Sequence, residues 1–521
     1  MKNRIIRPGF PLSQVGGYIR PLAFLTPYPQ QLRVGKTTVN LSIRRVVVLA
    51  SNAMQDVADI LIVDLREICG IAVVSSGDNA DFVIKLEVAD QQLKPEGYTL
   101  TVSENAAEIT GQDVAGLFYG VQTFLQLVAF GQEEIPALKI SDWPTCGLRS
   151  VMLDMGRAIY SKALIMRTIR IMSRLKLNTL HLHLYDDHLM GLRFKHLPLG
   201  SENPGAITID ELAEIVKYAR QYHISVCPEL ESWGHVGSLM YHYPECYGDT
   251  GMYMEGASLG IGPKSFNLLE KIYDEVIPAL ETESMVHLGL DEARWKALPD
   301  VKNPESMNPT WLVGQLYDLL MNVGRRHNKN LTMRIWADHG GRALPSHLEQ
   351  KIIVEPWQYF EKESDIKKKI RRFSGAEKGQ FIMGGGSSSM HLNGSFDATR
   401  LWCEAGKKSP NCLGINICLW ESNRLESYLI SLFGGAACAW SPQRAEKPLE
   451  GDILHDYHVG VIFNRMLSWQ SLFSDANPDA LLSERGPAVY KGYYISGLKI
   501  GQPVAPTVLR LRHPVIMHGE K

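Results

Sequence analysis

The sequence lacks the features that mark several large classes of protein. Its eight cysteines are scattered and form no CxxC pair, and the first 20 residues hold no continuous apolar segment typical of a signal peptide. These absences predict free thiols, no structural zinc and a cytoplasmic location. The apolar segments are interrupted before they reach the length of a transmembrane helix, so we expect no membrane partner.

An excess of charge is also absent. Lys and Arg total 54 and Asp and Glu total 56, which gives a net charge of −2. Because nucleic-acid-binding modules are usually strongly basic, we expect no nucleic-acid partner. Hydrophobic residues make up 45% of the chain and charged residues 21%, the composition of a folded globular protein. With 521 residues, the chain is long enough for more than one domain.

Residues 1–145 predict a small α+β domain. Short β-rich runs open it, at 44–50, 59–65 and 81–88. Residues 97–111 alternate apolar and polar side chains around a polar turn, a pattern typical of a hairpin. A helix is expected over 113–130, with Asp113 as its N-cap.

Residues 146–450 alternate between strand and helix patterns and predict an α/β fold, a (β/α)8 TIM barrel. The strand candidates are 149–155, 178–185, 224–230, 285–291, 331–337, 351–357, 380–385 and 413–420. Helix candidates between them are 162–177, 208–223, 309–327 and 363–373. A doubly wound open sheet is the alternative, but no GxGxxG follows a strand. Residues 451–521 are expected to form a helical or mixed segment on the barrel, with a strand candidate at 507–517.

Charged side chains and tryptophans follow the expected carboxyl ends of these strands, where barrel enzymes carry their reacting groups. They are Asp154, Arg157, Asp186, Asp187, His188, Glu229, Glu231, His235, Asp291, Glu292, Trp336, Asp338, Glu355, Trp357, Trp420 and Glu421. Indole rings stack on sugars and carboxylates transfer protons, so this set favours a carbohydrate-active enzyme. The adjacent Asp291 and Glu292 could supply the acid and the second stabilising group that glycosidic cleavage needs.

Each feature taken alone has a simpler explanation. Two adjacent acidic residues usually form an exposed turn, and a tryptophan at a strand end usually packs in the core. His181 and His183 share one strand face and could bind a metal, but a zinc site needs a third ligand, so no metal is predicted. The charged residues and tryptophans at the strand ends are nevertheless expected together at one end of the barrel, and this joint position favours the catalytic interpretation.

The ordered motifs resemble those of glycoside hydrolase family 20, the β-N-acetylhexosaminidases. RLKLNTLHLHLYDD is similar to K-x-N-x-x-x-x-H-x-D-D, PELESWGH to P-E-[ILF]-D-x-P-G-H, and VHLGLDE to the H-x-G-G-D-E of the catalytic pair. LRSVMLDMGR, RIWAD, VEPWQ and LWES resemble the family's sugar-binding strand ends. The N-terminal domain is similar too, through PYPQ and the hairpin and helix that follow.

The resemblance implies a retaining exo-glycosidase acting on an oligosaccharide or glycoconjugate. The acetamido oxygen of the substrate would attack the anomeric carbon, so no cofactor is implied. Glu292 is expected to act as general acid and base and Asp291 to hold the acetamido group. Asp186 and His235 are expected to form a relay toward Glu292. The expected sugar-binding residues are Arg157, Trp336, Trp357, His391, Asn393, Trp420 and Glu421.

Three positions depart from the family pattern. His391 stands where the family has an acetamido-binding tyrosine, and Trp233 where it has proline. Ser422 occupies the position of the W-x-E glutamate, while Glu421 is one residue earlier. Three alternatives therefore stay open: an enzyme for plain GlcNAc or GalNAc, one for a decorated hexosamine such as a 6-sulfated sugar, and a catalytically silent sugar-binding protein. A metal-dependent barrel hydrolase is the last alternative, and the sequence does not indicate the oligomeric state.

Overall fold

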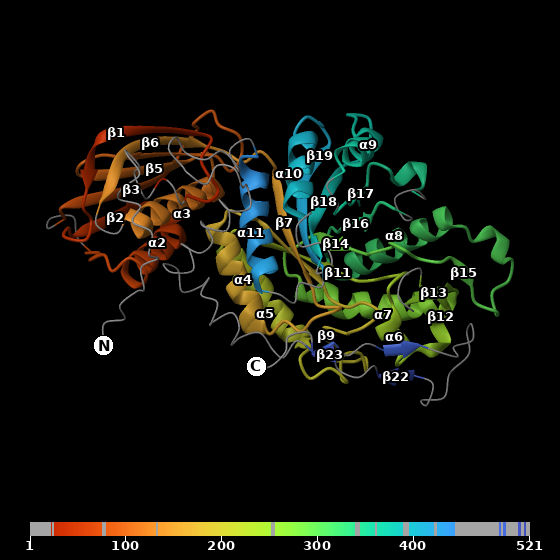
Figure 1. Ribbon diagram of the computed structural model, residues 1–521. Helices are drawn as coiled ribbons and strands as arrows, with labels where there is room; N and C mark the ends of the chain where they lie inside the picture. The colour runs from red at the N-terminus through yellow and green to blue at the C-terminus, as the bar shows by residue number, and fades with distance from the viewer. Residues whose placement is uncertain are drawn as a thin grey trace. The chain divides into compact units, whose positions relative to one another are not determined.

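A computed structural model describes residue 22, most of residues 25–442, and four short strands beyond them (Figure 1). The gaps within the main stretch are 76–79, 132–133, 252–255, 339–343, 360–361, 389–394 and 421–424. Side chains are likewise left out at 387–388, at 395–397, at 425–430 and in the four late strands.

The described residues form two compact units. The first comprises residues within 1–149, 170–178 and 429–481, and the second residues within 150–169, 179–428 and 482–521. Because each unit draws on several stretches of the chain, this division does not decide the limits 1–145, 146–450 and 451–521, which stay a prediction.

The first unit contains a six-stranded mixed sheet. In spatial order its strands are β1 (Gln31–Val39), β6 (Ile135–Asp142), β4 (Tyr98–Val102), β5 (Ala106–Gly111), β3 (Phe82–Val88) and β2 (Val46–Ala50). The antiparallel pair β4 and β5 is the predicted hairpin, and β5, β3 and β2 run parallel. Figure 1 shows helices α2 and α3 along one face of this sheet. The predicted α+β domain is therefore confirmed in its class.

The strand expected at 59–65 is wrong, because these residues lie in helix α2 (Gln55–Glu67). Its buried side chains include Val57, Leu61 and Leu65, which recur every four residues and so share one helical face. The run is rich in β-branched residues, and this composition resembles a strand when the four-residue spacing is overlooked.

Helix α3 (Val114–Gly131) begins as predicted, since the side chain of Asp113 accepts the backbone N–H of Gly116 at 2.8 Å. By length and composition it could cross a membrane, contrary to the expectation that no segment reaches that length. In the structure 78% of this segment is buried inside the protein, as in a core helix.

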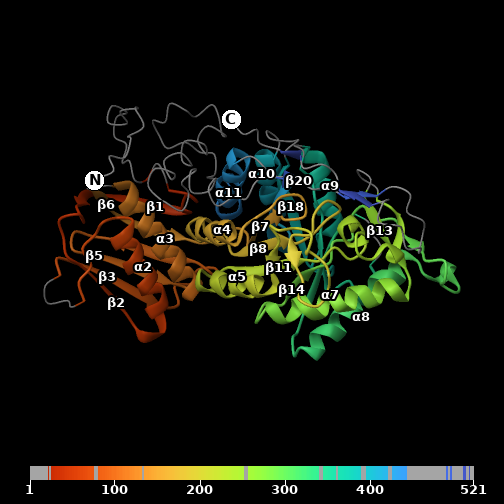
Figure 2. The same ribbon diagram turned by 90° about the horizontal axis from the view of Figure 1, so that it is seen from below.

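The second unit is built on a closed barrel of eight parallel strands, which confirms the predicted fold (Figure 2). The strands are β7 (Leu148–Asp154), β8 (Thr179–His183), β11 (Ser225–Glu229), β14 (Met285–His287), β16 (Thr332–Trp336), β17 (Ile352–Glu355), β18 (Phe381–Ser388) and β19 (Cys412–Trp420). Each falls within or overlaps a strand candidate from the sequence. Chain order equals spatial order, and β19 pairs with β7 through the closure of the barrel.

Helices follow most of these strands, and those that fall within the second unit lie outside the barrel where the two views agree (Figures 1 and 2). They are α4 (Lys162–Arg174), α5 (Ile209–Gln221), α7 (Pro263–Ala279), α8 (Pro309–Arg326), α9 (Glu363–Phe373), α10 (Ser395–Gly406) and α11 (Leu425–Trp440). Local sequence sets their starts: Thr208 and Glu211 form a capping box for α5, and Asn308 caps α8. The four helix candidates from the sequence are confirmed.

Besides four 3-10 helices of three residues each, the described chain contains further short elements. They are α6 (Gly237–Met240) and the strands β9 (Leu192–Arg193), β10 (Ile207–Thr208), β12 (Tyr247–Thr250), β13 (Ala257–Ile261), β15 (Lys296–Ala297), β20 (Val489–Tyr490), β21 (Tyr493–Ile495), β22 (Leu509–Leu511) and β23 (Val515–Ile516). Strands β22 and β23 fall in the strand candidate at 507–517, and they pair with β21 and β20 respectively.

Candidate active site

Asp291 and Glu292 follow strand β14 at the carboxyl end of the barrel. The backbone there is strained, because the non-glycine residues Leu290 and Glu292 have φ angles of 74° and 46°. This path separates the two carboxylates: the side chain of Asp291 is 12% exposed, while that of Glu292 is 32% exposed. One carboxylate is thus enclosed and its neighbour can reach a molecule outside the barrel.

His235, in the loop after β11, joins the two carboxylates to a third. Its Nε2 lies 3.2 Å from Oε2 of Glu292 and 3.5 Å from Oδ2 of Asp291. Its Nδ1 lies 3.0 Å from Oδ2 of Asp187, whose other oxygen accepts the backbone N–H groups of Gly237 and Ala257 at 2.9 Å. Asp187 is therefore fixed in place and orients the imidazole.

The sequence predicts Asp186 as the partner of His235, and the geometry differs on this point. Oδ2 of Asp186 lies 3.7 Å from Nδ1 of His235, beyond hydrogen-bonding distance, and 2.7 Å from Nη2 of Arg157. Arg157 also donates to Asp154 at 3.2 Å. Asp186 is thus primarily the counter-ion of the arginine, while Asp187, adjacent in sequence, takes the hydrogen bond expected of Asp186.

Burial and neighbouring charges shift the pKa values of this group. Burial alone would lower the pKa of His235, but Asp186 and Asp291, with hydrogen bonds to Asp187 and Glu292, raise it well above its usual value. Burial raises the pKa of Asp291 to about 8; the cation of His235 opposes this shift, and Asp338 and Glu292 add to it. The imidazolium of His235 therefore balances a site rich in carboxylates.

Aromatic side chains surround the same barrel end. Trp336 is fully buried, and Trp420, at the end of β19, has its ring centroid 5.8 Å from that of Trp336. Trp357 stacks on Tyr359 with centroids 5.5 Å apart, and Tyr359 meets Trp420 edge-on at 6.5 Å. The guanidinium of Arg157 lies 5.2 Å from the centre of the Trp420 ring. The structure thus brings the predicted Arg157, Trp336, Trp357 and Trp420 to one region.

Some residues of this region were not assigned a role from the sequence. Asp187, Glu229 and Asp338 stand among the strand-end residues, but no pattern singled them out. Oδ2 of Asp338 accepts the backbone N–H of Glu292 at 3.0 Å and so supports the strained segment. Tyr359 was missed altogether, although an aromatic residue two positions after Trp357 and just beyond β17 was a signal that could have found it.

Four groups of side chains in the described chain have atoms close enough to hold a metal ion. They are His181 with Glu229 and His287, His183 with Glu229 and Glu231, Asp186 with Asp187 and His235, and His235 with Asp291 and Glu292. The last two belong to the hydrogen-bonded group just described. In the first, Asn416 donates to Nδ1 of His181 at 2.9 Å, so the proton of this ring lies on Nε2, the nitrogen that faces Glu229. In this tautomer His181 offers no ligand atom toward Glu229, and Nδ1 of His287 is occupied by the backbone N–H of Gly289 at 3.0 Å. These contacts favour a hydrogen-bonded cluster.

Comparison with known families decides what kind of protein carries this arrangement. The family model "Glycosyl hydrolase family 20, catalytic domain" matches residues 147–376, and the model for domain 2 of the same family matches residues 23–143. The chain belongs to glycosyl hydrolase family 20. The family 20 resemblance read from the motifs is confirmed, and both compact units contain residues that these two models match.

Individual β-hexosaminidases show the same likeness. A β-hexosaminidase from Porphyromonas gingivalis is 26% identical over 52% of this chain and 40% of its own length. Subunit A2 of a β-hexosaminidase from Dictyostelium discoideum is 27% identical over 51% of this chain and 52% of its own length. The chain thus spans about half or less of these curated relatives. A mutant β-hexosaminidase from Streptomyces plicatus, solved with GlcNAc as product, shares the fold with a TM-score of 0.66 at 22% identity, over 88% of this chain and 96% of its own.

The family 20 positions that depart from the pattern lie mostly outside the described residues. His391, Asn393, Glu421 and Ser422 all do, so their predicted roles stay predictions. Trp233, at the position of the family's proline, is fully buried and stacks on Trp295 with centroids 6.2 Å apart. The exchange of proline for tryptophan there is therefore accommodated by packing in the core.

Proposed function

We propose that this chain is a retaining exo-glycosidase that removes terminal β-linked N-acetylhexosamine, GlcNAc or GalNAc, with the acetamido group of the substrate as nucleophile. One observation carries the proposal. Oδ1 of Asp291 is buried and has no hydrogen-bond partner among the described residues, while its neighbour Glu292 is partly exposed. A buried acceptor without a donor is costly and is expected where a ligand supplies the donor. The acetamido N–H would supply it.

The proposed reaction proceeds in two steps. The acetamido carbonyl oxygen attacks the anomeric carbon as the bond from this carbon to the leaving oxygen breaks, and Glu292 gives its proton to that oxygen. An oxazolinium ion results, whose positive charge Asp291 stabilises once it is ionised. Water then attacks the anomeric carbon, Glu292 takes a proton from it, and the acetamido group is restored. His235, 3.2 Å from Glu292, orients the carboxylate and favours its ionised form between the steps.

Arg157 and the tryptophans would bind the sugar ring. A guanidinium donates hydrogen bonds to hydroxyl groups in a fixed planar fork, and its pairing with Asp186 orients that fork. The partly buried Trp357 and Trp420 present apolar faces on which a sugar ring and an acetamido methyl group can pack, and the buried Trp336 supports them from beneath. Water excluded by these rings strengthens the electrostatic contribution of Asp291.

Aryl glycosides test the proposal. The protein is expected to release p-nitrophenol from the N-acetylglucosaminide or N-acetylgalactosaminide and not from the glucoside, which lacks the amide. Glu292→Gln is expected to lower kcat at least about 1,000-fold, whereas Glu305→Gln, a change at an exposed glutamate outside the site, leaves it unchanged. Equal rates on the glucoside, or full activity of Glu292→Gln, would overturn the proposal. A 6-sulfated aryl substrate in the same series tests the decorated hexosamine.

We also propose a cytoplasmic location. Its support is that the eight cysteines, all within the described residues, are free thiols in the structure. Cell fractionation of the native host with an antibody against the chain tests it, and recovery of the protein in the secreted or periplasmic fraction would contradict it.

A further inference from the structure

We infer that Glu229 is a positioning residue that fixes the indole of Trp336 and, through it, the aromatic wall of the site. For its effect on substrate this inference rests on the proposed function, but the contact itself does not. Glu229 ends strand β11 and is fully buried, so it cannot touch a sugar directly. Glu229 is expected to act on the site indirectly, through the indole of Trp336.

The contact between the two residues crosses the inside of the barrel. Nε1 of Trp336 donates to Oε1 of Glu229 at 2.6 Å, and both side chains are at most 1% exposed. Strands β11 and β16 are not neighbours, because β14 lies between them. The hydrogen bond is therefore made by side chains alone and selects one orientation of the indole.

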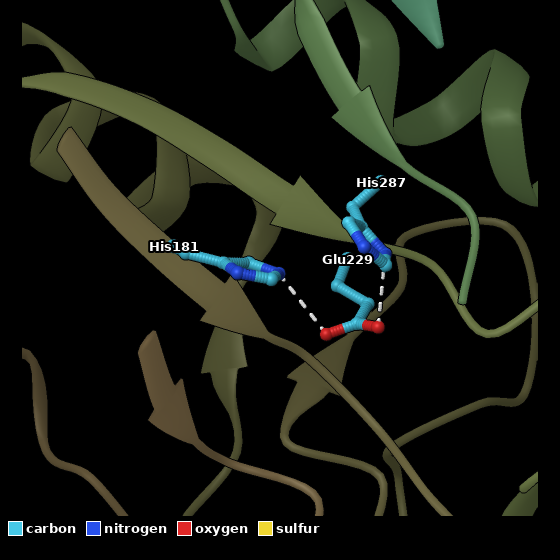
Figure 3. Close-up of side chains that lie close together, drawn as sticks. All are labelled: His181, Glu229 and His287. Atoms are coloured by element: carbon cyan, nitrogen blue, oxygen red, sulfur yellow. Dashed lines mark ion pairs between the residues drawn. The ribbon is translucent and has the colours of Figure 1, made fainter. Parts of the chain in front are cut away.

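The carboxylate of Glu229 lies between two histidine rings (Figure 3). Figure 3 shows its carboxylate between His181 and His287, with Nε2 of His181 3.0 Å from Oε2 and Nδ1 of His287 2.9 Å from Oε1. Asn416 donates to the far nitrogen of His181 at 2.9 Å and so places the ring proton toward Glu229. The N–H of His181 thus faces Oε2 and the indole N–H of Trp336 binds Oε1, whereas Nδ1 of His287 accepts the backbone N–H of Gly289 at 3.0 Å and donates nothing to the carboxylate.

The negative charge of Glu229 strengthens its hydrogen bond with the indole of Trp336. Burial would raise its pKa, but the surrounding histidines, with His183 as the cation among them, lower it well below the usual value, so the group is an anion. Burial lowers the pKa of His181 and of His287 to about 4, so both rings are neutral near pH 7. A hydrogen bond to an anion is shorter and stronger than one to a neutral oxygen, in agreement with the 2.6 Å contact.

Loss of the hydrogen bond between Glu229 and Trp336 would alter the aromatic side chains expected to bind the sugar. Trp336 packs with Met152 and Cys418, and the partly buried Trp357, Tyr359 and Trp420 lie against this cluster. An indole free to turn would shift these rings, and small displacements of positioning groups reduce catalysis strongly. Glu229 is therefore expected to affect kcat/KM only as long as residue 336 is a tryptophan.

A double-mutant cycle tests this dependence. Glu229→Gln is expected to lower kcat/KM on an aryl N-acetylhexosaminide about 10-fold or more in the natural background. In a Trp336→Phe background, where no indole N–H exists, the same change is expected to lower it less than about 3-fold. An equal loss in both backgrounds would overturn the inference.

Tryptophan fluorescence gives a readout that needs no enzymatic activity. Glu229→Gln is expected to shift the emission, and the shift is expected to vanish in Trp336→Phe but to persist in Trp311→Phe, a control at a half-buried indole of α8. Glu229→Asp keeps the charge and serves if the Gln variant does not fold. A shift that persists without Trp336 would overturn the inference, whereas a vanishing shift in a protein without glycosidase activity would support it and contradict the proposed function instead.

Discussion

The buried position of Asp291 disfavours the ionised form of its carboxyl group. Because its folded-state pKa of about 8 lies above the unfolded value of 3.8, the folded protein binds this proton more tightly than the unfolded chain does. The contribution of Asp291 to stability is therefore most favourable below pH 4 and is lost as the pH rises toward 8. A residue of this kind is expected where an ionised carboxylate is needed for function and not for folding.

Asp291→Asn removes the penalty, so the variant is expected to be more stable than the natural protein at pH 8, by on the order of 1–3 kcal/mol. The difference is expected to shrink as the pH falls and to disappear below about pH 3, where the natural Asp291 is protonated in both states. Thermal unfolding at several pH values measures this. A variant that is less stable at pH 8, or a difference independent of pH, would contradict the assignment.

The side chains of the adjacent Asp186 and Asp187 have different partners. The substitution of each by asparagine should therefore affect kcat and KM differently. Asp187→Asn removes the anion beside Nδ1 of His235 but keeps an oxygen for the two backbone N–H groups. We expect its kcat to fall about 10- to 100-fold with little change in KM. Asp186→Asn releases Arg157 and is expected to raise KM mainly.

Steady-state kinetics of both variants on one aryl N-acetylhexosaminide distinguish the two roles. If Asp186→Asn produced the large loss of kcat and Asp187→Asn none, the relay predicted from the sequence would be the right one.

At the scale of the element, the loop after β14 depends on a residue without a side chain. Gly289 has a φ of +69°, and a Cβ there would lie 1.8 Å from Oε2 of the buried Glu231. Gly289→Ala is therefore expected to destabilise the fold by about 2 kcal/mol or more and to displace Asp291 and Glu292. Urea unfolding and kcat together measure the two effects.

Gly314→Ala is the matched control. Gly314 lies inside helix α8, and the nearest atom to an added Cβ is Cγ of Pro345 at 3.7 Å. This change is expected to stabilise the helix by about 0.5–1 kcal/mol and to leave kcat unchanged. If both alanine variants had the same stability, the strain ascribed to the loop after β14 would be absent.

The elements differ in how far the sequence predicts them, and the reasons are physical. Barrel strands such as β8 are buried on both sides and form short apolar runs between polar turns, so their positions are readable. Helix α2 also contains a short apolar run, and only the four-residue spacing of its buried side chains marks it as a helix. Strand β1 is exposed along most of its length, so no apolar alternation reveals it.

The site shows the same limit. Motif spacing predicts that Asp291, Glu292 and His235 meet, because the carboxyl ends of parallel strands converge. It does not decide between Asp186 and Asp187, since adjacent side chains leave a loop in directions set by the backbone, here through N–H groups of Gly237 and Ala257. The hydrogen bond from Trp336 to Glu229 joins strands that are not neighbours, so no short sequence motif reveals it.

At the scale of the whole molecule, charges inside the barrel are balanced by one another. Arg334 pairs with Glu355, and Asn416 donates both to Glu355 and to His181, each at 2.9 Å. Together with Trp336 and Glu229, these contacts form a continuous hydrogen-bonded layer beneath the site. A divalent ion between His181 and His287 would have to displace the ring proton of His181 and share Glu229 with the indole N–H of Trp336.

We therefore expect that the protein needs no metal. Incubation with EDTA followed by gel filtration is expected to leave kcat and the unfolding midpoint unchanged, and elemental analysis to find less than about 0.1 zinc, manganese or nickel ion per chain. Stoichiometric metal whose removal lowers the midpoint would contradict this expectation. His181→Gln would separate the two cases: as a lost ligand it would abolish metal content, whereas as part of the hydrogen-bonded layer it would loosen Glu229 and shift the fluorescence of Trp336.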